Sequence, residues 1–101
     1  MIDWALITGF EWDEGNARKS HDKHHVGQAE AEQLFFNEPL IVVPDVRHSE
    51  QEPRSHALGQ TDEGRLLHIT FTMRAEGKLI RVISARNMSR REREAYGKAE
   101  S

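Results

Sequence analysis

Two apolar stretches joined by a short turn, between residues 65 and 85, constrain the fold of this chain more than any other feature. In Arg65–Met73 the side chains alternate between two faces. One of these faces is apolar throughout: Leu67, Ile69, Phe71 and Met73. A period of two predicts a β-strand. Leu79–Ala85 follows the turn Ala75-Glu76-Gly77 and is largely apolar on both faces, which indicates a central strand. Strands joined by so short a turn are antiparallel.

Shorter segments extend the expected sheet to three or four strands. Leu40–Val43 is apolar, and Ser55–Gln60 is a weaker strand that leads into a hairpin turn at Thr61–Gly64. Ile7–Trp12, before the first predicted helix, is a candidate short strand outside this run of strands. The polar stretch 45–54 between the first two of these strands reads as a loop. We therefore expect an antiparallel sheet of three to four strands.

Two helices are expected before this sheet. Asp13 is a good N-cap for a helix over Glu14–His25. A second helix over Gln28–Asn37 ends before Pro39, because proline disfavours helical geometry in the preceding residue. Both helices precede the first strong strand.

One helix is expected after the sheet. Ser89 and Glu92 match the S-x-x-E capping box, so a C-terminal helix begins at Ser89 and runs to about Gly97. The order of elements predicts an α+β fold with helices gathered on one side of the sheet. We expect a single domain over 1–101, with 1–8 as a lead-in and 98–101 as a tail.

Length and residue types exclude several classes of protein. A chain of 101 residues has room for one core and no second catalytic domain. Cysteine is absent, which rules out disulfides and a thiol nucleophile. No apolar run approaches the roughly 20 residues of a membrane span, and the N-terminus lacks the basic region of a signal peptide. We expect a soluble cytoplasmic protein without a membrane partner.

The charges are divided unevenly along the chain. Residues 1–64 contain 5 basic and 13 acidic side chains, whereas residues 65–98 contain 9 basic and 3 acidic ones. Five of the basic residues lie between Arg81 and Arg93, and all five are arginines. Arginine suits bidentate contact with phosphate, so one interpretation is a polyanion-binding surface. The other interpretation is a solvated charged surface that pairs with the acidic half of the same molecule.

Histidines cluster in the first predicted helix. His21 and His25 are four residues apart, the helical spacing of two zinc ligands, but the Glu of an H-E-x-x-H motif is missing. A third ligand would have to come from a distant histidine: His48, His56 or His68. We therefore expect no metal or other cofactor. A single histidine, His24 beside Lys23, is the better candidate for an acid or base near neutral pH. The alternative is a His-rich surface helix.

Arg81 stands inside a strand among apolar neighbours, Arg65 opens the preceding strand, and Arg86 follows the end of the last one. A charged side chain at such a position either pairs with an acid from the N-terminal half or points at a ligand. The glycine-rich phosphate loops and the G-x-S-x-G nucleophile motif are absent from the sequence.

The order and spacing of several short motifs resemble the BrnT family of toxins, from about Gly9 to Tyr96. The most specific part is Ile83-Ser84-Ala85-Arg86 followed by the Ser89–Tyr96 helix. The other matching segments are Gly9–Asn16, Lys23-His24-x-Val26, Glu30–Glu32, Phe35–Leu40, His48–Glu50, Leu58-Gly59 and Gly64–Leu67. One departure is His25, which stands where the family has glycine; a histidine changes the backbone preference at a position where glycine would allow positive φ. Ser20 and His21 replace the Asn and the aromatic residue of close relatives.

This resemblance implies a toxin of a type II toxin–antitoxin system with a RelE-like fold. It implies a metal-independent endoribonuclease that inhibits translation and growth. It also implies a BrnA-like, DNA-binding antitoxin partner in a hetero-oligomer that contacts operator DNA only through the antitoxin. The candidate catalytic residues are Arg65, Arg81, Arg86, His24 and Lys23. The candidate RNA-binding residues are Arg90, Arg91 and Arg93.

The same residues allow a second function of a different class. A non-catalytic module could bind nucleic acid through phosphate contacts alone, or the arginines could form the surface that a partner protein covers. An enzyme shortens RNA, whereas a binder shifts its mobility and leaves it intact.

Overall fold

The structure is a computed structural model that describes residues 2–47 and 52–100. The stretch His48–Glu50 of the family resemblance, which includes the candidate ligand His48, lies outside the described residues. So does the middle of the predicted loop 45–54.

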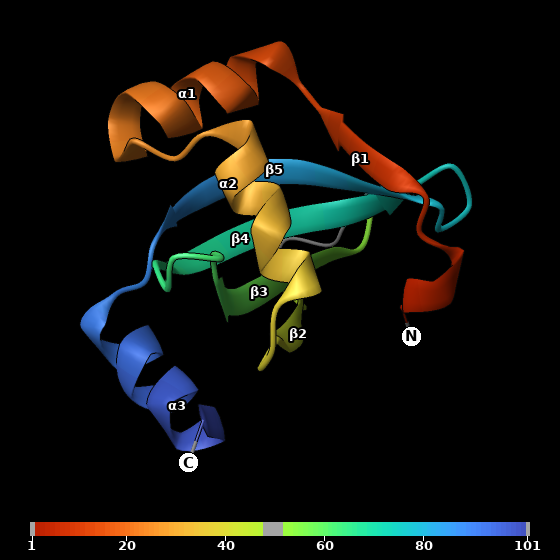
Figure 1. Cartoon of the computed structure of the whole chain (residues 1–101). Helices are drawn as coiled ribbons and strands as arrows, with labels where there is room; N and C mark the ends of the chain where they lie inside the picture. Colours follow the sequence, from red (N-terminus) through yellow and green to blue (C-terminus); the bar gives the residue numbers. More distant parts are fainter. Residues whose placement is uncertain (1, 48–51, 101) are drawn as a thin grey trace.

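A five-stranded mixed sheet forms the centre of the molecule (Figure 1). Its strands are β1 (Gly9–Trp12), β2 (Ile41–Asp45), β3 (Arg54–Gln60), β4 (Leu66–Arg74) and β5 (Leu79–Asn87), in the spatial order β1-β5-β4-β3-β2. The β4–β5 hairpin is central, as its apolar pattern predicts. Both β3–β4 and β4–β5 are antiparallel pairs.

The expected strand count and the purely antiparallel sheet are wrong. The short segment around Ile7–Trp12 does form a strand, β1, and it pairs in parallel with β5, with Glu11 opposite Arg81. Turn rules fix the direction of strands that are joined by a hairpin. They give no direction for two strands about 70 residues apart in the sequence, such as β1 and β5.

Two helices lie over one face of the sheet (Figure 1). Helix α1 (Glu14–His24) packs on β5 and begins at the predicted N-cap, where Asp13 Oδ1 accepts from the Asn16 N–H at 3.2 Å. Helix α2 (Gln28–Gln33) is shorter than expected and continues as a 3₁₀ turn, η2 (Leu34–Phe36). Another 3₁₀ turn, η1 (Trp4–Leu6), precedes β1.

The core lies between these helices and the sheet. It is built from the apolar face of β4 with buried side chains of its neighbours: Val26, Ala31, Leu34, Ala57, Leu67, Ile69, Phe71, Ile80, Val82 and Ala85. Phe35 packs edge-on against Phe71, with ring centroids 5.3 Å apart. A Cβ at Gly59 would stand only 2.8 Å from Leu34 Cγ, so η2 approaches β3 at a point where only glycine fits.

The third helix, α3 (Arg90–Glu100), departs from the expected arrangement. It lies beyond the end of β5 and beside β3 (Figure 1). Tyr96 is its only buried residue, and the Tyr96 hydroxyl donates to the Pro39 carbonyl at 2.6 Å. The first turn of α3 faces His68, which belongs to the side of β4 opposite the core. The helices are therefore divided between the two faces of the sheet.

Candidate functional site

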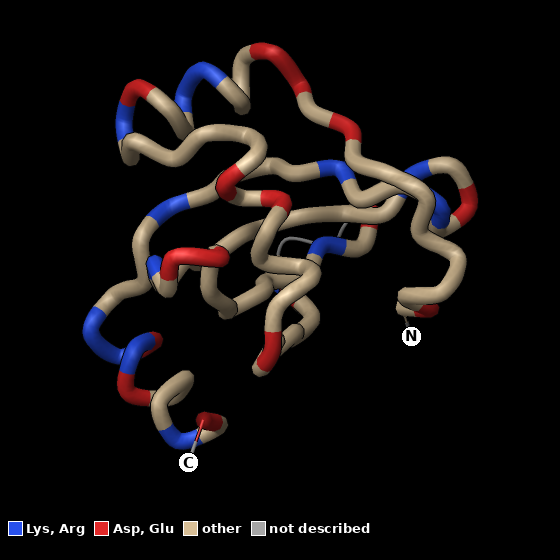
Figure 2. The backbone as a smooth tube through the Cα atoms, in the orientation of Figure 1, with Lys and Arg blue, Asp and Glu red and all other residues tan. Residues whose placement is uncertain are grey.

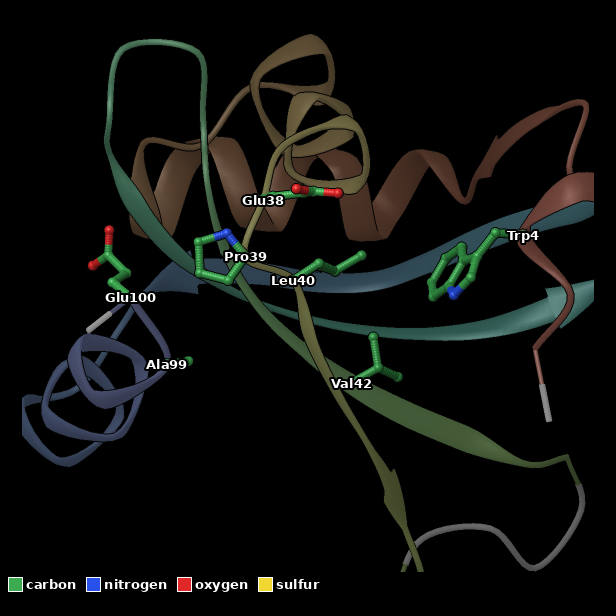
Figure 3. Close-up of a pocket in the computed structure, with 7 residues that line it drawn as sticks. All are labelled: Trp4, Glu38, Pro39, Leu40, Val42, Ala99 and Glu100. Carbon is green, nitrogen blue, oxygen red and sulfur yellow. The ribbon is translucent and has the colours of Figure 1, made fainter.

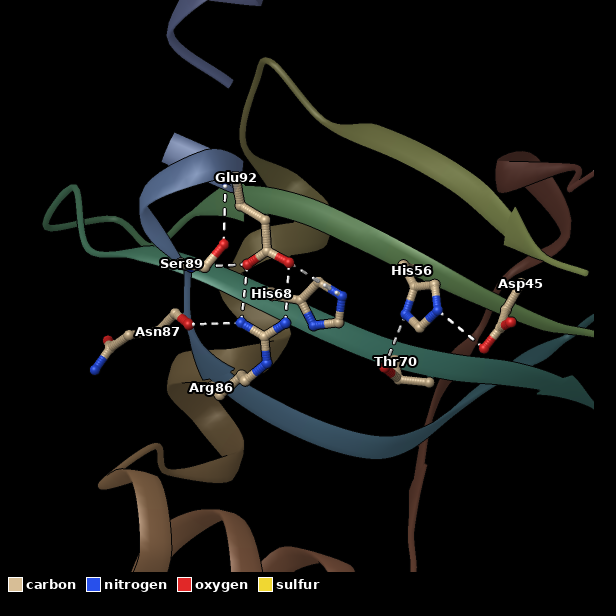
Figure 4. A network of polar contacts seen from close by, with 8 residues as sticks. All are labelled: Asp45, His56, His68, Thr70, Arg86, Asn87, Ser89 and Glu92. Carbon is tan, nitrogen blue, oxygen red and sulfur yellow. Dashed lines mark hydrogen bonds and ion pairs between the residues drawn. The ribbon is translucent and has the colours of Figure 1, made fainter. Parts of the chain in front are cut away.

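A polar network occupies the sheet face opposite α1 and α2 (Figure 4). His68 of β4 and Arg86 of β5 are cross-strand partners on this face. The Arg86 guanidinium donates to both carboxylate oxygens of Glu92, at 2.8 and 2.9 Å. His68 Nε2 lies 3.9 Å from the same carboxylate. Three side chains from β4, β5 and α3 thus meet at one point.

The start of α3 fixes Glu92 in this position. The Ser89 hydroxyl accepts from the Glu92 N–H at 3.2 Å, and Glu92 Oε1 accepts from the Ser89 N–H at 2.8 Å. This is the capping box that the sequence predicts. Because the capping carboxylate also holds Arg86, the beginning of the helix and the arginine are coupled through one side chain.

The network shifts the pKa values of two groups. Burial would raise the pKa of Glu92, but the hydrogen bonds from Arg86 and from the Ser89 N–H outweigh it and lower the pKa to about 2. Burial and the nearby Arg86 charge lower the pKa of His68 to about 4. His68 is therefore neutral at pH 7, so its contact with Glu92 is then not an ion pair. Within the described part of the chain, the buried His68 Nδ1 has no hydrogen-bond partner.

His56 of β3 extends the network towards the edge of the sheet. Its ring lies against that of His68, with centroids 4.9 Å apart. Its two nitrogens contact Thr70 Oγ1 and Asp45 Oδ2, each at 3.0 Å. A line of polar side chains therefore crosses the face from Glu92 to Asp45 (Figure 4).

Arg65 lies on the other side of the sheet, at the same end of the molecule as Arg86. It donates to the carbonyls of His24 and His25, to Glu30 Oε1 and to Asn87 Oδ1, at 2.9 to 3.1 Å. These contacts tie the end of α1 to the end of β5. Arg86 Nη1 in turn donates to the Asn87 carbonyl at 3.0 Å, so Asn87 links the two arginines.

Arg81 lies apart from the other candidates. It is on the same sheet face as Arg86 but nearer the start of β5, where it is paired with Glu11 and Asp13. Of the two interpretations of this residue, the structure shows pairing with acids of the N-terminal half. Arg81 contacts none of the other candidate residues among the described contacts.

Blue Lys and Arg segments mark the end of α1 and the start of α3 on the same side of the molecule (Figure 2). Lys23 and His24 are in the last turn of α1, and Arg90, Arg91 and Arg93 are in the first turn of α3. Arg90 pairs with Glu94 at 3.6 Å, and Arg93 donates to the Met88 carbonyl. We call Arg65, Arg86, Arg90, Arg91 and Arg93 the arginine end.

Ion pairing reduces the charge division seen in the sequence. Arg65, Arg74 and Arg81 each pair with an acid from the first 64 residues: Glu30, Glu52 and, for Arg81, Glu11 and Asp13. Arg86 and Arg90 pair with Glu92 and Glu94. Within the arginine end, Arg91 and Arg93 carry no ion pair with a described residue, so of its five arginines they are the most available to a polyanion.

Sequence reasoning finds Arg86 but misses its surroundings. Glu92 is visible only as a capping residue, and His56 and His68 only as distant metal ligands. Across residues 2–47 and 52–100, His, Asp and Glu side chains form no group of three or more that could hold a metal. The alternation of His68 and Thr70 with apolar residues does signal a polar second face. The pairing register that puts His68 beside Arg86 depends on tertiary structure.

Comparison with known proteins gives the class to which this protein belongs. A family model described as "Ribonuclease toxin, BrnT, of type II toxin-antitoxin system" matches residues 12–92. The chain belongs to this BrnT family of ribonuclease toxins, whose type II systems imply an antitoxin partner.

One solved structure shares the fold. It is the crystal structure of the Brucella abortus ribonuclease toxin, BrnT, with a TM-score of 0.63 at 21% sequence identity. The match covers 82% of this chain and 99% of that chain. No curated protein sequence matches. Within the described ranges, no helix is long and apolar enough to cross a membrane.

Proposed function

We propose that the chain is a metal-independent endoribonuclease toxin that acts on RNA in the cytoplasm and thereby inhibits translation and growth. A BrnA-like, DNA-binding antitoxin neutralises the toxin by forming a hetero-oligomer with it. The chain contacts operator DNA only through the antitoxin in this complex. The observation that carries the proposal is the arginine end, where Arg86, Glu92 and His68 converge beside the cations of α3. The RelE-like relationship expected from the sequence remains a prediction.

The chemistry needs no group beyond the RNA and the protein. The ribose 2′-OH attacks the adjacent phosphorus, a bond from O2′ to phosphorus forms, and the bond to O5′ breaks. A base takes the 2′-OH proton, and an acid protonates the leaving O5′. The products are a 2′,3′-cyclic phosphate and a 5′-hydroxyl.

In this proposal Arg86 stabilises the charge that develops on the phosphate. Its guanidinium is about one-third exposed and donates two hydrogen bonds to one carboxylate, so it is oriented before RNA arrives. Glu92 is a positioning residue that holds Arg86. Removal of one preorganised donor of this kind typically lowers the catalytic rate by a factor on the order of 10²–10³.

The other sequence candidates keep proposed roles around this centre. His24, supported by the Lys23 charge, is the acid or base, and Arg65 fixes its backbone by bonding the His24 carbonyl. Arg90, Arg91 and Arg93 bind the RNA backbone. Arg81 is the most remote member, because it would have to leave Glu11 and Asp13 to reach a phosphate.

A second candidate function is a binding module without catalysis. The observation that favours it is that all three proposed catalytic arginines are held by carboxylates. Such a protein would retard RNA in a gel and leave its length unchanged.

Expression of the chain alone in a bacterial host tests the proposal. We expect growth arrest and shortened total RNA for the unchanged chain and for Arg18→Ala, an exposed arginine outside the arginine end. We expect neither effect for Arg86→Ala. Arrest and RNA shortening by Arg86→Ala at the parent's level would refute the assignment of Arg86. Intact RNA in cells that produce the parent chain would favour the binding module.

A further inference from the structure

Exposed apolar side chains are concentrated in one region of the described molecule, away from the arginine end. The large ones lie in η1, in η2 and along or just after β2: Trp4, Leu6, Phe36, Val43 and Val46. The segments 2–12 and 34–46, which contain these elements, include four acidic residues and no Lys or Arg. Two of the four are already bonded, Glu11 to Arg81 and Asp45 to His56, so the negative charge of this apolar region rests on Asp3 and Glu38.

A groove runs through this region (Figure 3). It has a volume of about 800 Å³ and is lined by Trp4, Glu38, Pro39, Leu40, Val42, Ala99 and Glu100. β2 is the edge strand of the sheet, and Leu40 and Val42 pack only partly against the core. The groove exists because the helices over the sheet leave the edge at β2 uncovered.

The charge of the groove is of one sign. Its two ionisable lining residues are Glu38 and Glu100, whose side chains flank Pro39 in Figure 3. Neither carboxylate forms an ion pair with a Lys or Arg in the described part of the chain. The outer edge of β2 has no strand partner in the sheet, so its backbone groups can receive an added strand.

We propose that this groove anchors the antitoxin through an extended segment that carries both apolar and basic (Lys or Arg) side chains on one side. The apolar side chains would enter the floor formed by Trp4, Leu40 and Val42. The basic ones would face Glu38 and Glu100 in the same groove. Because side chains two positions apart in an extended strand point to the same side, apolar residues at i and i+2 can be followed on that side by a basic residue at i+4. The proposal rests on the pairing with an antitoxin that the family implies, and it adds the surface and the chemistry of the segment.

Charge complementarity selects this occupant over a second copy of the chain. Pairing two such grooves would bring Glu38 and Glu100 of one copy close to Glu38 and Glu100 of the other. Juxtaposed like charges are unfavourable. A basic segment instead gains two charge contacts in the same place.

Helix α3 connects the groove to the arginine end. Ala99 and Glu100 are at one end of this helix, and Arg90 is at the other. An 11-residue helix is about 16 Å long. An antitoxin chain that leaves the groove along α3 would therefore cover the proposed RNA-binding arginines after about five extended residues.

Charge reversal in the groove tests the proposal. The probe is the purified product of the gene adjacent to that of the chain, and its Kd is measured by calorimetry. We expect the double variant Glu38→Lys with Glu100→Lys to raise the Kd at least about tenfold, since each substitution replaces an attraction by a repulsion. The matched control, Glu14→Lys with Glu63→Lys, changes net charge equally at exposed positions outside the groove and should stay within about threefold.

Hydrogen exchange of the same complex locates the contact independently of any variant. We expect slower exchange of the amides in Ile41–Val43 when the probe is bound. An unchanged Kd for the groove variant, with a melting curve like that of the parent, would overturn the docking surface. So would unchanged exchange along β2. If the unchanged chain does not bind the probe at all, the proposed pairing with this antitoxin is wrong, and so is the docking surface. Ribonuclease activity is tested separately, by RNA cleavage.

Discussion

At the scale of single residues, His68 and Glu92 make the folded state sensitive to acid. Both pKa values are lower in the folded chain than in an unfolded one, at about 4 for His68 and about 2 for Glu92. In such cases the unfolded chain binds protons first, so stability falls as the pH falls. The loss begins below about pH 6.5 because of His68 and continues below about pH 4.5 because of Glu92.

The first prediction concerns this pH dependence. The free energy of unfolding should fall by up to about 3 kcal/mol between pH 6.5 and pH 4 because of His68. Denaturant titrations at a series of pH values measure the slope. His68→Gln should flatten it over this interval, whereas His21→Gln, an exposed control, should not. An equal slope in His68→Gln and the parent would show that His68 is not the responsible group.

The second prediction separates the two tasks of Glu92. Glu92→Gln retains a side chain that suits the capping box but removes the charge that orients Arg86. We expect it to lower the rate of RNA cleavage at saturating RNA about tenfold or more. Ser89→Ala removes the cap hydroxyl but keeps the ion pair between Arg86 and Glu92. It should lower the free energy of unfolding by about 1 kcal/mol and leave the rate of RNA cleavage unchanged. Equal losses of cleavage in both variants would contradict a separate role in orienting Arg86.

At the scale of elements, the junction of α1 and α2 carries local strain. His25 is the C-cap of α1 and has left-handed geometry, with φ 56° and ψ 37°. Its N–H donates to the His21 carbonyl, and its own carbonyl accepts from Arg65, so the backbone conformation is held from both sides. Glycine adopts this conformation without the steric penalty of a Cβ atom.

The third prediction follows from this geometry. His25→Gly should raise the free energy of unfolding by about 0.5–1 kcal/mol, since relief of the left-handed strain exceeds the entropic cost of glycine. The matched control His21→Gly, inside α1, should lower it by about 0.5–1 kcal/mol. Thermal melts of the two variants and the parent give the comparison. A decrease in both variants would show that the His25 side chain contributes stability that outweighs the strain.

The elements that could be predicted from the sequence are those fixed by local rules. The Asp13 N-cap, the Ser89–Glu92 capping box and the β4–β5 hairpin each depend on residues within a few positions of one another. The parallel pairing of β1 with β5 and the place of α3 depend on contacts across the whole chain. The break at His25 is a case between the two: the glycine of the family would allow positive φ there, and His25 has φ 56° although it is not glycine.

At the scale of the whole molecule, three arginines of the basic part of the sequence form ion pairs with acids of the acidic part. Arg65 and Arg81 were candidates from their sequence positions, and the structure shows both paired with N-terminal acids. Sequence alone could not decide between such pairing and ligand contact, because Glu30 and Glu11 are far from these arginines in the chain. Arg86 and the arginines of α3 could therefore be predicted from the sequence as candidate site residues, whereas the polar network around Arg86 could not.

The fourth prediction tests the remaining cationic surface. Binding of single-stranded RNA should weaken with salt, with a slope of log K against log salt of about −2 to −3 for three or four phosphate contacts. Arg91→Ala should weaken binding and reduce the slope by about 0.7. Arg18→Ala on α1 should change neither. A slope equal to that of the parent for Arg91→Ala would place RNA elsewhere on the molecule.

The most direct test of the account is cleavage of RNA by the purified chain in the presence of EDTA. Each reaction compares the parent, Arg86→Ala and Arg18→Ala, and the ends of the products are identified chemically. We predict fragments with 2′,3′-cyclic phosphate and 5′-hydroxyl ends from the parent and from Arg18→Ala. The rate for Arg86→Ala should be lower by about 10²–10³. RNA that stays intact with the parent chain, or equal rates for the parent and Arg86→Ala, would contradict a metal-independent ribonuclease centred on Arg86.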